Sequence, residues 1–388
     1  MKKILIVNNN MKIGGVQKSL CNLLWALDGR YEITLLLFDR SGALLQELPP
    51  KVKVIACKSA FRFFGISQAQ CKGLDKLKRG ALAFLGRRFG RNCALKLIHP
   101  TQKTLPGTYD AAIAFLHNGN PHHFYGGVQD FVLRHVKARK KIAFLHCDYR
   151  LSDANHKINN QTIRCFDTIA ACSDGCRRAF CEVLPELSGK CIVVRNCHRF
   201  AQIQSLAAQD TAEYPQKCFH LLTVARLAHE KGVERAIAAA AYLRKKGIDF
   251  RLHIVGSGAM RAQLQALTER EELLEQVLFY GEQENPYRFM KHADLLLMTS
   301  FHEAAPLVIE EAASLALPVL TTETTSSDEM VVQADNGFVC ANSQEAIDET
   351  LYALLSEPSR LAAVRKRMQG RTSDNSAALL QFQQMLED

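Results

Sequence analysis

The feature that most constrains the fold of this chain is an alternation of short apolar runs with amphipathic segments. Short apolar runs bounded by turn residues predict buried strands of a parallel sheet, and the amphipathic segments between them predict helices that cover it. The segments 17–27 and 175–184 are amphipathic and follow such runs. The strands predicted in the first half are 4–7, 33–38, 52–56, 111–116, 141–145, 168–171 and 192–194.

The alternation stops at a polar stretch, 201–216, which contains Pro215 and is predicted to be a linker. It then restarts, so the chain of 388 residues is predicted to form two doubly wound α/β domains, 1–198 and 199–375. A last helix is predicted over 377–386. The second half contributes predicted strands 221–225, 251–255, 277–279, 295–298 and 319–321, and predicted helices 233–245 and 259–267.

Composition is that of a globular protein in a reducing compartment. Apolar residues make up 47% of the chain and charged residues 23%, and no run is long enough to span a bilayer. The apolar run after the basic N-terminus has only four residues, 4–7, which is too short for a signal peptide. Thirteen cysteines without a C-x-x-C pair are expected to be buried thiols in the cytoplasm rather than metal ligands.

The net charge of +10 is concentrated in one segment. From Lys51 to Lys96 the basic residues are interleaved with aromatic and aliphatic ones, and Asp75 is the single acid. Such a segment, chiefly 58–96, can lie on an anionic membrane surface, and it can equally be a solvated helix face packed on its own domain. No motif supports binding of nucleic acid.

Two carboxylates, Glu303 and Glu311, flank seven mostly apolar residues. Pro306 between them is predicted to be the first helical position, because its fixed φ suits a helix start. The amides of Leu307 and Val308 would then point out of the helix start, where an anion can bind. An anion site beside carboxylates that accept hydroxyl protons suits a ligand that is part phosphate and part sugar.

Two cations follow the predicted strand 221–225, Arg226 directly and Lys231 five residues later. At the carboxyl end of a parallel strand they are candidates for clamping a diphosphate. The alternative is a pair of surface cations around a helix start. A lysine just before a helix is unfavourable against the helix dipole unless an anion is near, which favours the functional interpretation.

Glycines and a histidine complete the candidate positions at strand ends. Gly14 and Gly15 follow the first predicted strand, and Gly256 and Gly258 follow 251–255. Glycines between a strand and a helix let a phosphate approach the backbone closely, although each pair alone could be only a turn. His146 follows the predicted strand 141–145, where a histidine is a candidate for catalysis.

Taken together, these residues resemble those of glycosyltransferase family 4, whose members have the GT-B fold. The resemblance covers nearly the whole chain and is strongest between Leu221 and Gly337. The motifs that carry it, in chain order, are Val224–Leu227 with Lys231-Gly232, Val255–Gly258, Ala293-Asp294, Ser300, Glu303 with Glu311, Leu317–Val319, Glu329 and Asn336–Val339.

The resemblance implies two Rossmann-like domains that face each other across a cleft, with the C-terminal helix 376–388 returning to the N-terminal domain. It also implies a retaining hexosyltransferase that needs neither a metal nor a cofactor. Such an enzyme moves a sugar from a nucleotide sugar, with a UDP-sugar favoured, to a glycan or lipid-linked acceptor in cell-surface polysaccharide or glycolipid synthesis. The N-terminal domain would bind the acceptor, and the enzyme would be cytoplasmic or peripheral on the inner membrane face.

The resemblance also implies roles for residues. Arg226 and Lys231 would hold the donor diphosphate, Glu311 the ribose hydroxyls and Glu303 the donor sugar, with His146 near the transferred sugar. Residues predicted to be catalytic are His146, Arg226, Lys231 and Glu303, and those predicted to bind the donor are Gly14, Gly15, Arg226, Lys231, Gly256, Gly258, Glu303, Pro306, Leu307, Val308 and Glu311.

Two positions depart from the family pattern. Ala304-Ala305 replaces a glycine followed by an aromatic residue, and Gln17 replaces an acid. A Cβ at position 304 would restrict positive φ and narrow the approach to the sugar. Two alternatives stay open at this point: a nucleotide-sugar epimerase of related fold, and a non-catalytic, basic, membrane-associated module.

Overall fold

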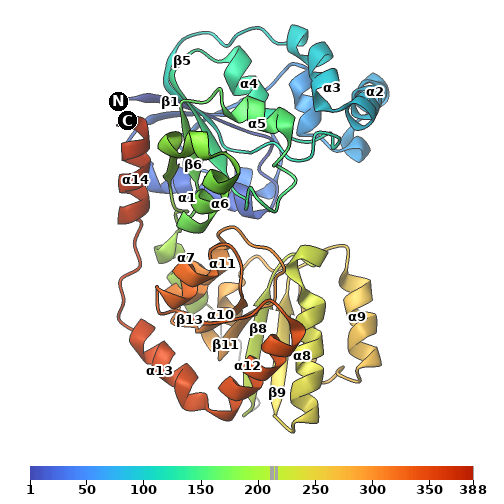
Figure 1. Cartoon of the computed structure of the whole chain (residues 1–388), viewed down its shortest axis with the longest axis vertical. Coiled ribbons are helices and arrows are strands. Elements are labelled where there is room, and N and C mark those ends of the chain that lie inside the picture. The colour runs from blue at the N-terminus through green and yellow to red at the C-terminus, as the bar shows by residue number, and fades with distance from the viewer. Residues whose placement is uncertain (210–213, 215–216, 388) are drawn as a thin grey trace. The chain divides into compact units, whose positions relative to one another are not determined.

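The computed structural model describes residues 1–209, 214 and 217–387. Contacts between Cα atoms divide the chain into two compact units. Unit 1 is Met1–His198 together with the C-terminal segment from Asn375, and unit 2 is Arg199–Asp374. Both units are α/β structures (Figure 1).

Unit 1 is built on a seven-stranded parallel sheet with the strand order β3-β2-β1-β4-β5-β6-β7. The central strands are apolar on both faces, because helices cover both sides of the sheet. Four consecutive residues of β1, from Ile4 to Val7, are fully buried. The strands are β1 Lys3–Asn8, β2 Glu32–Leu37, β3 Lys53–Ala56, β4 Tyr109–Ala114, β5 Ala138–Leu145, β6 Thr168–Ala171 and β7 Cys191–Val193.

The helices of unit 1 pack their apolar residues against this sheet. Leu20 and Leu24 of the first helix are fully buried in the main core cluster, next to strand residues such as Ile6. The α-helices are α1 Gly15–Ala26, α2 Gly73–Phe89, α3 Arg91–Ile98, α4 Val128–His135, α5 Lys157–Ile163, α6 Asp174–Val183 and α14 Ser376–Glu387. The 3-10 helices are η1 Ala43–Leu45, η2 Ala60–Phe64, η3 Gln68–Gln70, η4 His99–Thr101 and η5 Pro185–Lys190.

The C-terminal helix α14 packs on unit 1, although nearly the whole chain separates it from β1 in sequence (Figure 1). Ala378, Phe382 and Met385 share one face of the helix, as the spacing of four and three residues requires, and all three are buried in the core of unit 1. The ring of Phe382 lies 6.0 Å from that of Tyr31. The helix therefore belongs to the hydrophobic core of unit 1.

Unit 2 has a six-stranded parallel sheet with the order β10-β9-β8-β11-β12-β13. Helix α8 contributes a long run of small buried residues, including Ala236, Ala239 and Ala240, which allows it to lie close to the sheet. The strands are β8 Phe219–Val224, β9 Phe250–Val255, β10 Val277–Gly281, β11 Leu295–Met298, β12 Val319–Thr322 and β13 Gly337–Cys340. The helices are α7 Phe200–Ala208, η6 His229–Lys231, α8 Val233–Lys245, α9 Arg261–Arg270, α10 Tyr287–His292, α11 Leu307–Ser314, η7 Asp328–Val332, α12 Gln344–Ser356 and α13 Pro358–Met368.

The predicted strands are all present, and their ends differ from the prediction by at most three residues. Elements that were not predicted individually include β13, α4, α10, α12 and α13. Strand β13 is only four residues long and begins with Gly337, so its apolar run, Phe338–Cys340, is short. The predicted α/β class with two parallel sheets is confirmed.

The prediction of a linker over 201–216 was wrong for its first part. Residues Phe200–Ala208 form helix α7, and its residues Ile203 and Ala207 are buried against Phe289 and Met290. The helix itself is mostly apolar, and the polar residues that suggested a linker follow it in the sequence. Of the rest of the stretch, 210–213 and 215–216 lie outside the described residues, so the linker prediction is not tested there.

No helix within the described residues is both long enough and apolar enough to cross a membrane.

We expect Phe382→Ala to destabilise unit 1 by about 3–5 kcal/mol, because the removed ring leaves a cavity in the core. The matched control is Leu380→Ala on the same helix, since Leu380 is 57% exposed and should lose little. Urea unfolding followed by circular dichroism measures both variants. Equal stability of the two would show that α14 does not pack as described.

The free energy of unfolding should depend on pH through a buried histidine of unit 2, His253. Burial, and then the neighbouring His220 and Arg251, lower the pKa of His253 to about 3. Its ring bonds His220 at 3.0 Å and the hydroxyl of Tyr280 at 2.9 Å. Between about pH 6.5 and 3 the unfolded chain binds a proton that the folded chain does not, so stability falls as the pH falls.

We therefore expect His253 to lower the unfolding free energy by about 1.4 kcal/mol per pH unit below pH 6. The variant His253→Gln should make the loss of stability from pH 7 to pH 5 shallower than in the wild type. The exposed His302, replaced as His302→Gln, is the control and should leave the slope unchanged. Identical slopes for all three proteins would contradict the assignment.

Candidate functional site

Backbone hydrogen bonds join the loops that follow β8 and β9. The amide of Ala225 donates to the carbonyl of Val255 at 3.0 Å, and that of Leu227 donates to the carbonyl of Ser257 at 2.8 Å. Arg226 lies between these two bonds. The position of Arg226 is therefore set by pairing that continues beyond the end of the sheet.

Gly256 and Gly258 make this pairing possible. A Cβ at Gly256 would lie 1.9 Å from the carbonyl oxygen of Ala225, and one at Gly258 would lie 2.3 Å from that of Leu227. Gly256 also has φ near +142°, which other residues rarely adopt. The two glycines were predicted to let a phosphate approach the backbone, but in the structure the loop after β8 occupies that close position. Binding of the donor at these glycines stays a prediction.

Lys231, Glu303 and Ser300 form a connected polar cluster in unit 2. The ammonium of Lys231 donates to Oε1 of Glu303 at 2.7 Å, and the Ser300 hydroxyl donates to the same oxygen at 2.8 Å. The Glu303 side chain is 9% exposed and that of Lys231 is 24% exposed. The carboxylate thus supplies the anion that a lysine ahead of helix α8 requires.

Residues from three neighbouring strand ends hold this cluster in place. Gly232, directly after Lys231, has φ near +57°, and a Cβ there would lie 2.2 Å from the carbonyl oxygen of Thr299. The Thr299 hydroxyl donates to the carbonyl of Gly232 at 2.7 Å. The Thr322 hydroxyl donates to the carbonyl of Ser300 at 2.6 Å. These contacts join the loops after β8 and β11 to each other and to the end of β12.

Arg226 does not belong to this cluster. Its side chain is 70% exposed and forms an ion pair at 2.5 Å with Glu230, four residues later in the loop after β8. The structure thus pairs the two predicted diphosphate cations with different carboxylates. Arg226 is the more exposed of the two, and Lys231 is fixed beside Glu303.

Helix α11 begins at Leu307, so the prediction that Pro306 is the first helical residue was wrong by one position. Pro306 is the N-cap, with an extended ψ of 123° that a helical residue does not have. The amides of Leu307 and Val308 are the first two of the helix, where no carbonyl one turn earlier can accept from them. Glu311 lies inside the helix and is buried, and the Tyr287 hydroxyl donates to it at 3.2 Å.

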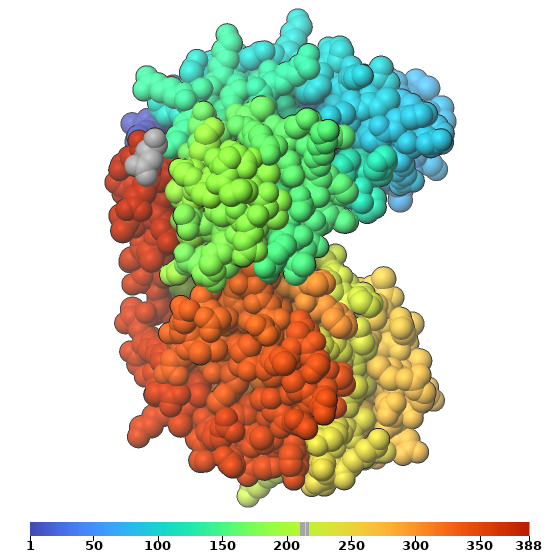
Figure 2. All heavy atoms as spheres, viewed as in Figure 1, coloured from blue at the N-terminus to red at the C-terminus, as the bar shows by residue number. Residues whose placement is uncertain are grey.

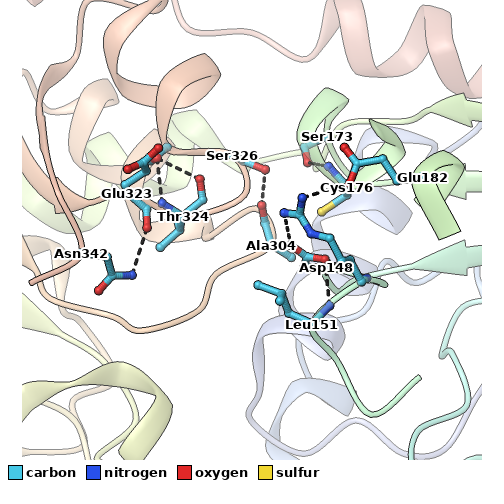
Figure 3. Close-up of polar contacts among 12 residues, drawn as sticks. Asp148, Leu151, Ser173, Cys176, Glu182, Ala304, Glu323, Thr324, Ser326 and Asn342 are labelled. Atoms are coloured by element: carbon cyan, nitrogen blue, oxygen red, sulfur yellow. Dashed lines mark hydrogen bonds and ion pairs between the residues drawn. The ribbon is translucent and has the colours of Figure 1, made fainter. Parts of the chain in front are cut away.

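The stretch between Glu303 and Pro306 adopts ordinary backbone angles. Among the described non-glycine residues, positive φ occurs at Glu272, Ala316 and Asp335, so Ala304 is not forced into the conformation that its Cβ disfavours. The Ser326 hydroxyl donates to the carbonyl of Ala304 (Figure 3). The expected restriction at position 304 therefore does not appear as backbone strain.

In unit 1, Gly14 and Gly15 form the start of helix α1. Gly14 is the N-cap with extended backbone, and a Cβ there would meet only the end of the Gln17 side chain. A Cβ at Gly15 would meet nothing within 4 Å. The fold of unit 1 therefore does not itself demand a glycine at position 15, unlike Gly256 in unit 2.

His146 follows β5 and stacks on two core phenylalanines. Its ring centroid lies 4.7 Å from that of Phe115 and 5.8 Å from that of Phe144. Burial, and then the nearby His117, lower the pKa of His146 to about 3, although the backbone of Phe115 hydrogen-bonds the ring and opposes the shift. The buried Nε2 of His146 has no hydrogen-bond partner among the described residues.

His146 is neutral at physiological pH, because a pKa of about 3 lies far below that range. One nitrogen of a neutral imidazole donates a hydrogen bond and the other accepts one. His117, after β4, is neutral as well, because burial lowers its pKa to about 4. Unit 1 thus offers uncharged acceptors at the carboxyl ends of adjacent strands.

No role was predicted from the sequence for Ser300 or Tyr287, which are the hydroxyl partners of the two carboxylates. Ser300 lies three residues before Glu303, and this spacing was a usable signal. Tyr287 lies 24 residues before Glu311, and only the packing of α10 on α11 brings them together. No group of three or more His, Cys, Asp or Glu in the described part of the chain is arranged to hold a metal ion.

The family model that matches this chain covers part of one unit only. Residues 209–371, which lie within unit 2, match the family model described as glycosyl transferases group 1. The lipopolysaccharide glucosyltransferase WaaG of Escherichia coli K12 is 36% identical over 136 residues, which are 34% of this chain and 36% of that protein. The chain spans about a third of the length of the curated relatives it matches first.

A Campylobacter jejuni relative is 31% identical over 134 residues, covering 34% of this chain and 35% of that protein. It is named N-acetylgalactosamine-N,N'-diacetylbacillosaminyl-diphospho-undecaprenol 4-alpha-N-acetylgalactosaminyltransferase. Both relatives are thus named as glycosyltransferases, and the matched family model covers 209–371.

Solved structures extend the likeness to the whole chain at the level of fold. Anabaena Alr3699/HepE in complex with UDP-glucose superposes with a TM-score of 0.69 at 19% identity, covering 100% of this chain and 99% of that one. WaaG superposes with a TM-score of 0.61 at 18% identity, covering 98% of both chains. The two Rossmann-like units therefore have the GT-B fold.

Two candidate glycines give a matched pair of variants. We expect Gly256→Ala to destabilise unit 2 by about 2–4 kcal/mol, because the new Cβ would overlap the carbonyl of Ala225 and the φ is unfavourable. Gly15→Ala should leave stability unchanged or slightly higher. Any loss of ligand binding in this variant would therefore be caused by a clash with the ligand and not by unfolding. Thermal unfolding separates the two, and equal destabilisation would contradict this account.

Proposed function

We propose that the protein is a retaining hexosyltransferase that moves a sugar from a nucleotide sugar to a glycan or lipid-linked acceptor. The observation that carries the proposal is the cluster of Lys231, Glu303 and Ser300 beside the start of helix α11. It places an ammonium, a hydroxyl-accepting carboxylate and free helix amides at the carboxyl ends of adjacent strands in one unit. These are the groups needed by a ligand with a diphosphate at one end and a sugar at the other.

The chemistry required of these residues is stabilisation of a leaving group. As the bond between the anomeric carbon and the diphosphate oxygen breaks, negative charge grows on the diphosphate. Lys231, Arg226 and the amides of Leu307 and Val308 would stabilise that charge, which is the role we assign them in place of a metal ion. The acceptor oxygen bonds to the anomeric carbon from the same face, and its proton passes to the departing phosphate.

The carboxylates would orient the donor. Glu303 would accept from hydroxyls of the donor sugar, while its ion pair with Lys231 fixes the position of the carboxylate. Glu311 would accept from the ribose hydroxyls, with Tyr287 fixing the carboxylate. His146, with its neutral ring, would contact a hydroxyl near the transferred sugar.

We propose a UDP-sugar as donor and a surface polysaccharide or glycolipid intermediate as acceptor. Support for the donor is that HepE, a structural neighbour, was solved with UDP-glucose. Support for the acceptor is that the Campylobacter relative is named for an undecaprenol-linked substrate. We further propose that the protein acts in the cytoplasm, at the inner face of the membrane where such acceptors are held.

We expect Lys231→Ala to lower sugar transfer by a factor on the order of 100 or more, because it removes a charge next to the leaving group. Arg226→Ala should have a smaller effect, since that side chain is exposed and already paired with Glu230. The control is Lys291→Ala, an exposed lysine of the same unit. Unchanged transfer in both Arg226→Ala and Lys231→Ala would refute the diphosphate assignment.

Glu303→Gln separates donor binding from transfer. The change releases Lys231 from its ion pair, so we expect UDP to stabilise the variant at least as well as the wild type in a thermal-shift assay. Transfer of the sugar should fall by a factor on the order of 100, because the hydroxyl acceptor is weakened. Loss of UDP binding would instead make Glu303 essential to the nucleotide site, and isomerised donor without acceptor would identify an epimerase.

A further inference from the structure

The basic segment of unit 1 divides into a buried part and an exposed part. The aromatic residues of η2, Phe61, Phe63 and Phe64, are buried in the core. They therefore cannot contact a surface outside the protein. The exposed apolar residues belong instead to helices α2 and α3, which lie at the surface of unit 1 (Figure 2, blue).

Helix α2 is fixed to unit 1 through one side only. Ala83 and Gly86 are buried, and a Cβ at Gly86 would contact the ring of Phe124 at 3.1 Å. The guanidinium of Arg79 lies over the same ring and donates to the carbonyl of Ile66 at 2.7 Å. These contacts define the inner face of the helix and hold it in one rotation about its axis.

The outer face of α2 is apolar. Leu74 is 72% exposed, Leu77 is 71% exposed and Phe84 is 64% exposed. Leu77 and Phe84 are two helical turns apart, so they lie on one line along the helix. Phe89 at the end of the helix is also exposed. Large apolar side chains presented together on an outer face mark a surface that contacts something else.

Positive charge surrounds this apolar line. Lys76, Lys78, Arg87 and Arg88 are all exposed on the helix. The single acid of the segment, Asp75, is held in an ion pair by Arg62 at 2.6 Å. The outer face therefore combines apolar side chains with cations and has no unpaired carboxylate. This combination matches the interface of an anionic bilayer, where leucine and phenylalanine enter the acyl boundary and cations meet the headgroups.

We propose that the outer face of α2, defined by Leu74, Leu77, Phe84 and their flanking cations, docks on an anionic lipid surface. The proposal rests on the proposed function for its purpose, which is to bring the enzyme to a membrane-held acceptor. Helix α2 would then lie parallel to the bilayer surface. Its exposed leucines and Phe84 would insert into the acyl boundary, and the flanking cations would select anionic headgroups. Each of these cations contributes about fivefold to binding near an anionic surface.

The test uses co-sedimentation of the full chain with two kinds of vesicle, phosphatidylcholine alone and phosphatidylcholine mixed with phosphatidylglycerol. The wild type should bind the mixed vesicles and not the neutral ones, and added salt should weaken binding. Leu77→Ser/Phe84→Ser should lower the partition coefficient by a factor on the order of ten or more. Lys78→Gln/Arg88→Gln should lower it by a similar factor on mixed vesicles.

The matched control for the apolar pair is Leu274→Ser/Leu380→Ser, which removes two leucines that are 65% and 57% exposed outside α2. It should bind vesicles like the wild type. Vesicle binding by Leu77→Ser/Phe84→Ser equal to that of the wild type would overturn the proposal, as would equal binding of the wild type to both kinds of vesicle or to neither.

Thermal stabilisation by UDP, measured on every variant, reports folding and the donor site separately from docking. If UDP still stabilises the variants while vesicle binding is lost, the docking proposal is supported. If no UDP-sugar is ever used while vesicle binding follows α2, the proposed function fails and the docking surface remains.

Discussion

The contact on which the candidate site depends is the approach of Gly232 to Thr299. A Cβ at position 232 would overlap the carbonyl of Thr299, so the loop after β8 lies directly on the loop after β11. The threonine hydroxyl closes the contact by donating back to Gly232. Because Lys231 precedes the glycine and Ser300 follows the threonine, this contact brings an ammonium and a hydroxyl to one carboxylate, Glu303.

The two units offer different kinds of polar group at their strand ends. Unit 2 holds charges in pairs, Lys231 with Glu303 and Arg226 with Glu230. Unit 1 holds neutral acceptors, since burial keeps His117 and His146 uncharged. Cations suit a phosphate, whereas carboxylates and neutral imidazoles can accept from hydroxyls. This difference supports a division of labour in which unit 2 binds the nucleotide end of a donor.

Part of the fold and of the candidate site could be predicted from sequence, and the limits have physical causes. The strands were predictable because parallel strands covered on both faces are apolar throughout, as Ile4–Val7 shows. Helix α7 was not, because its mostly apolar sequence is short and directly adjoins the polar residues that suggested a linker. At the site, Glu303 and Glu311 were marked by their shared motif, whereas Tyr287 was not, because no local pattern relates it to Glu311.

By itself, the sequence determined that the chain forms two parallel α/β sheets and which charged residues follow their strands. Apolar runs and the residues that follow them can be recognised locally in the sequence. Because the strands are parallel, their carboxyl ends then lie along one edge of each sheet. Tertiary structure decided the partners: Lys231 with Glu303 across 72 residues, Arg226 with Glu230, and α14 with the core of unit 1. It also decided that Phe61 is buried and Phe84 exposed, because packing and not composition selects which face of a segment meets the core.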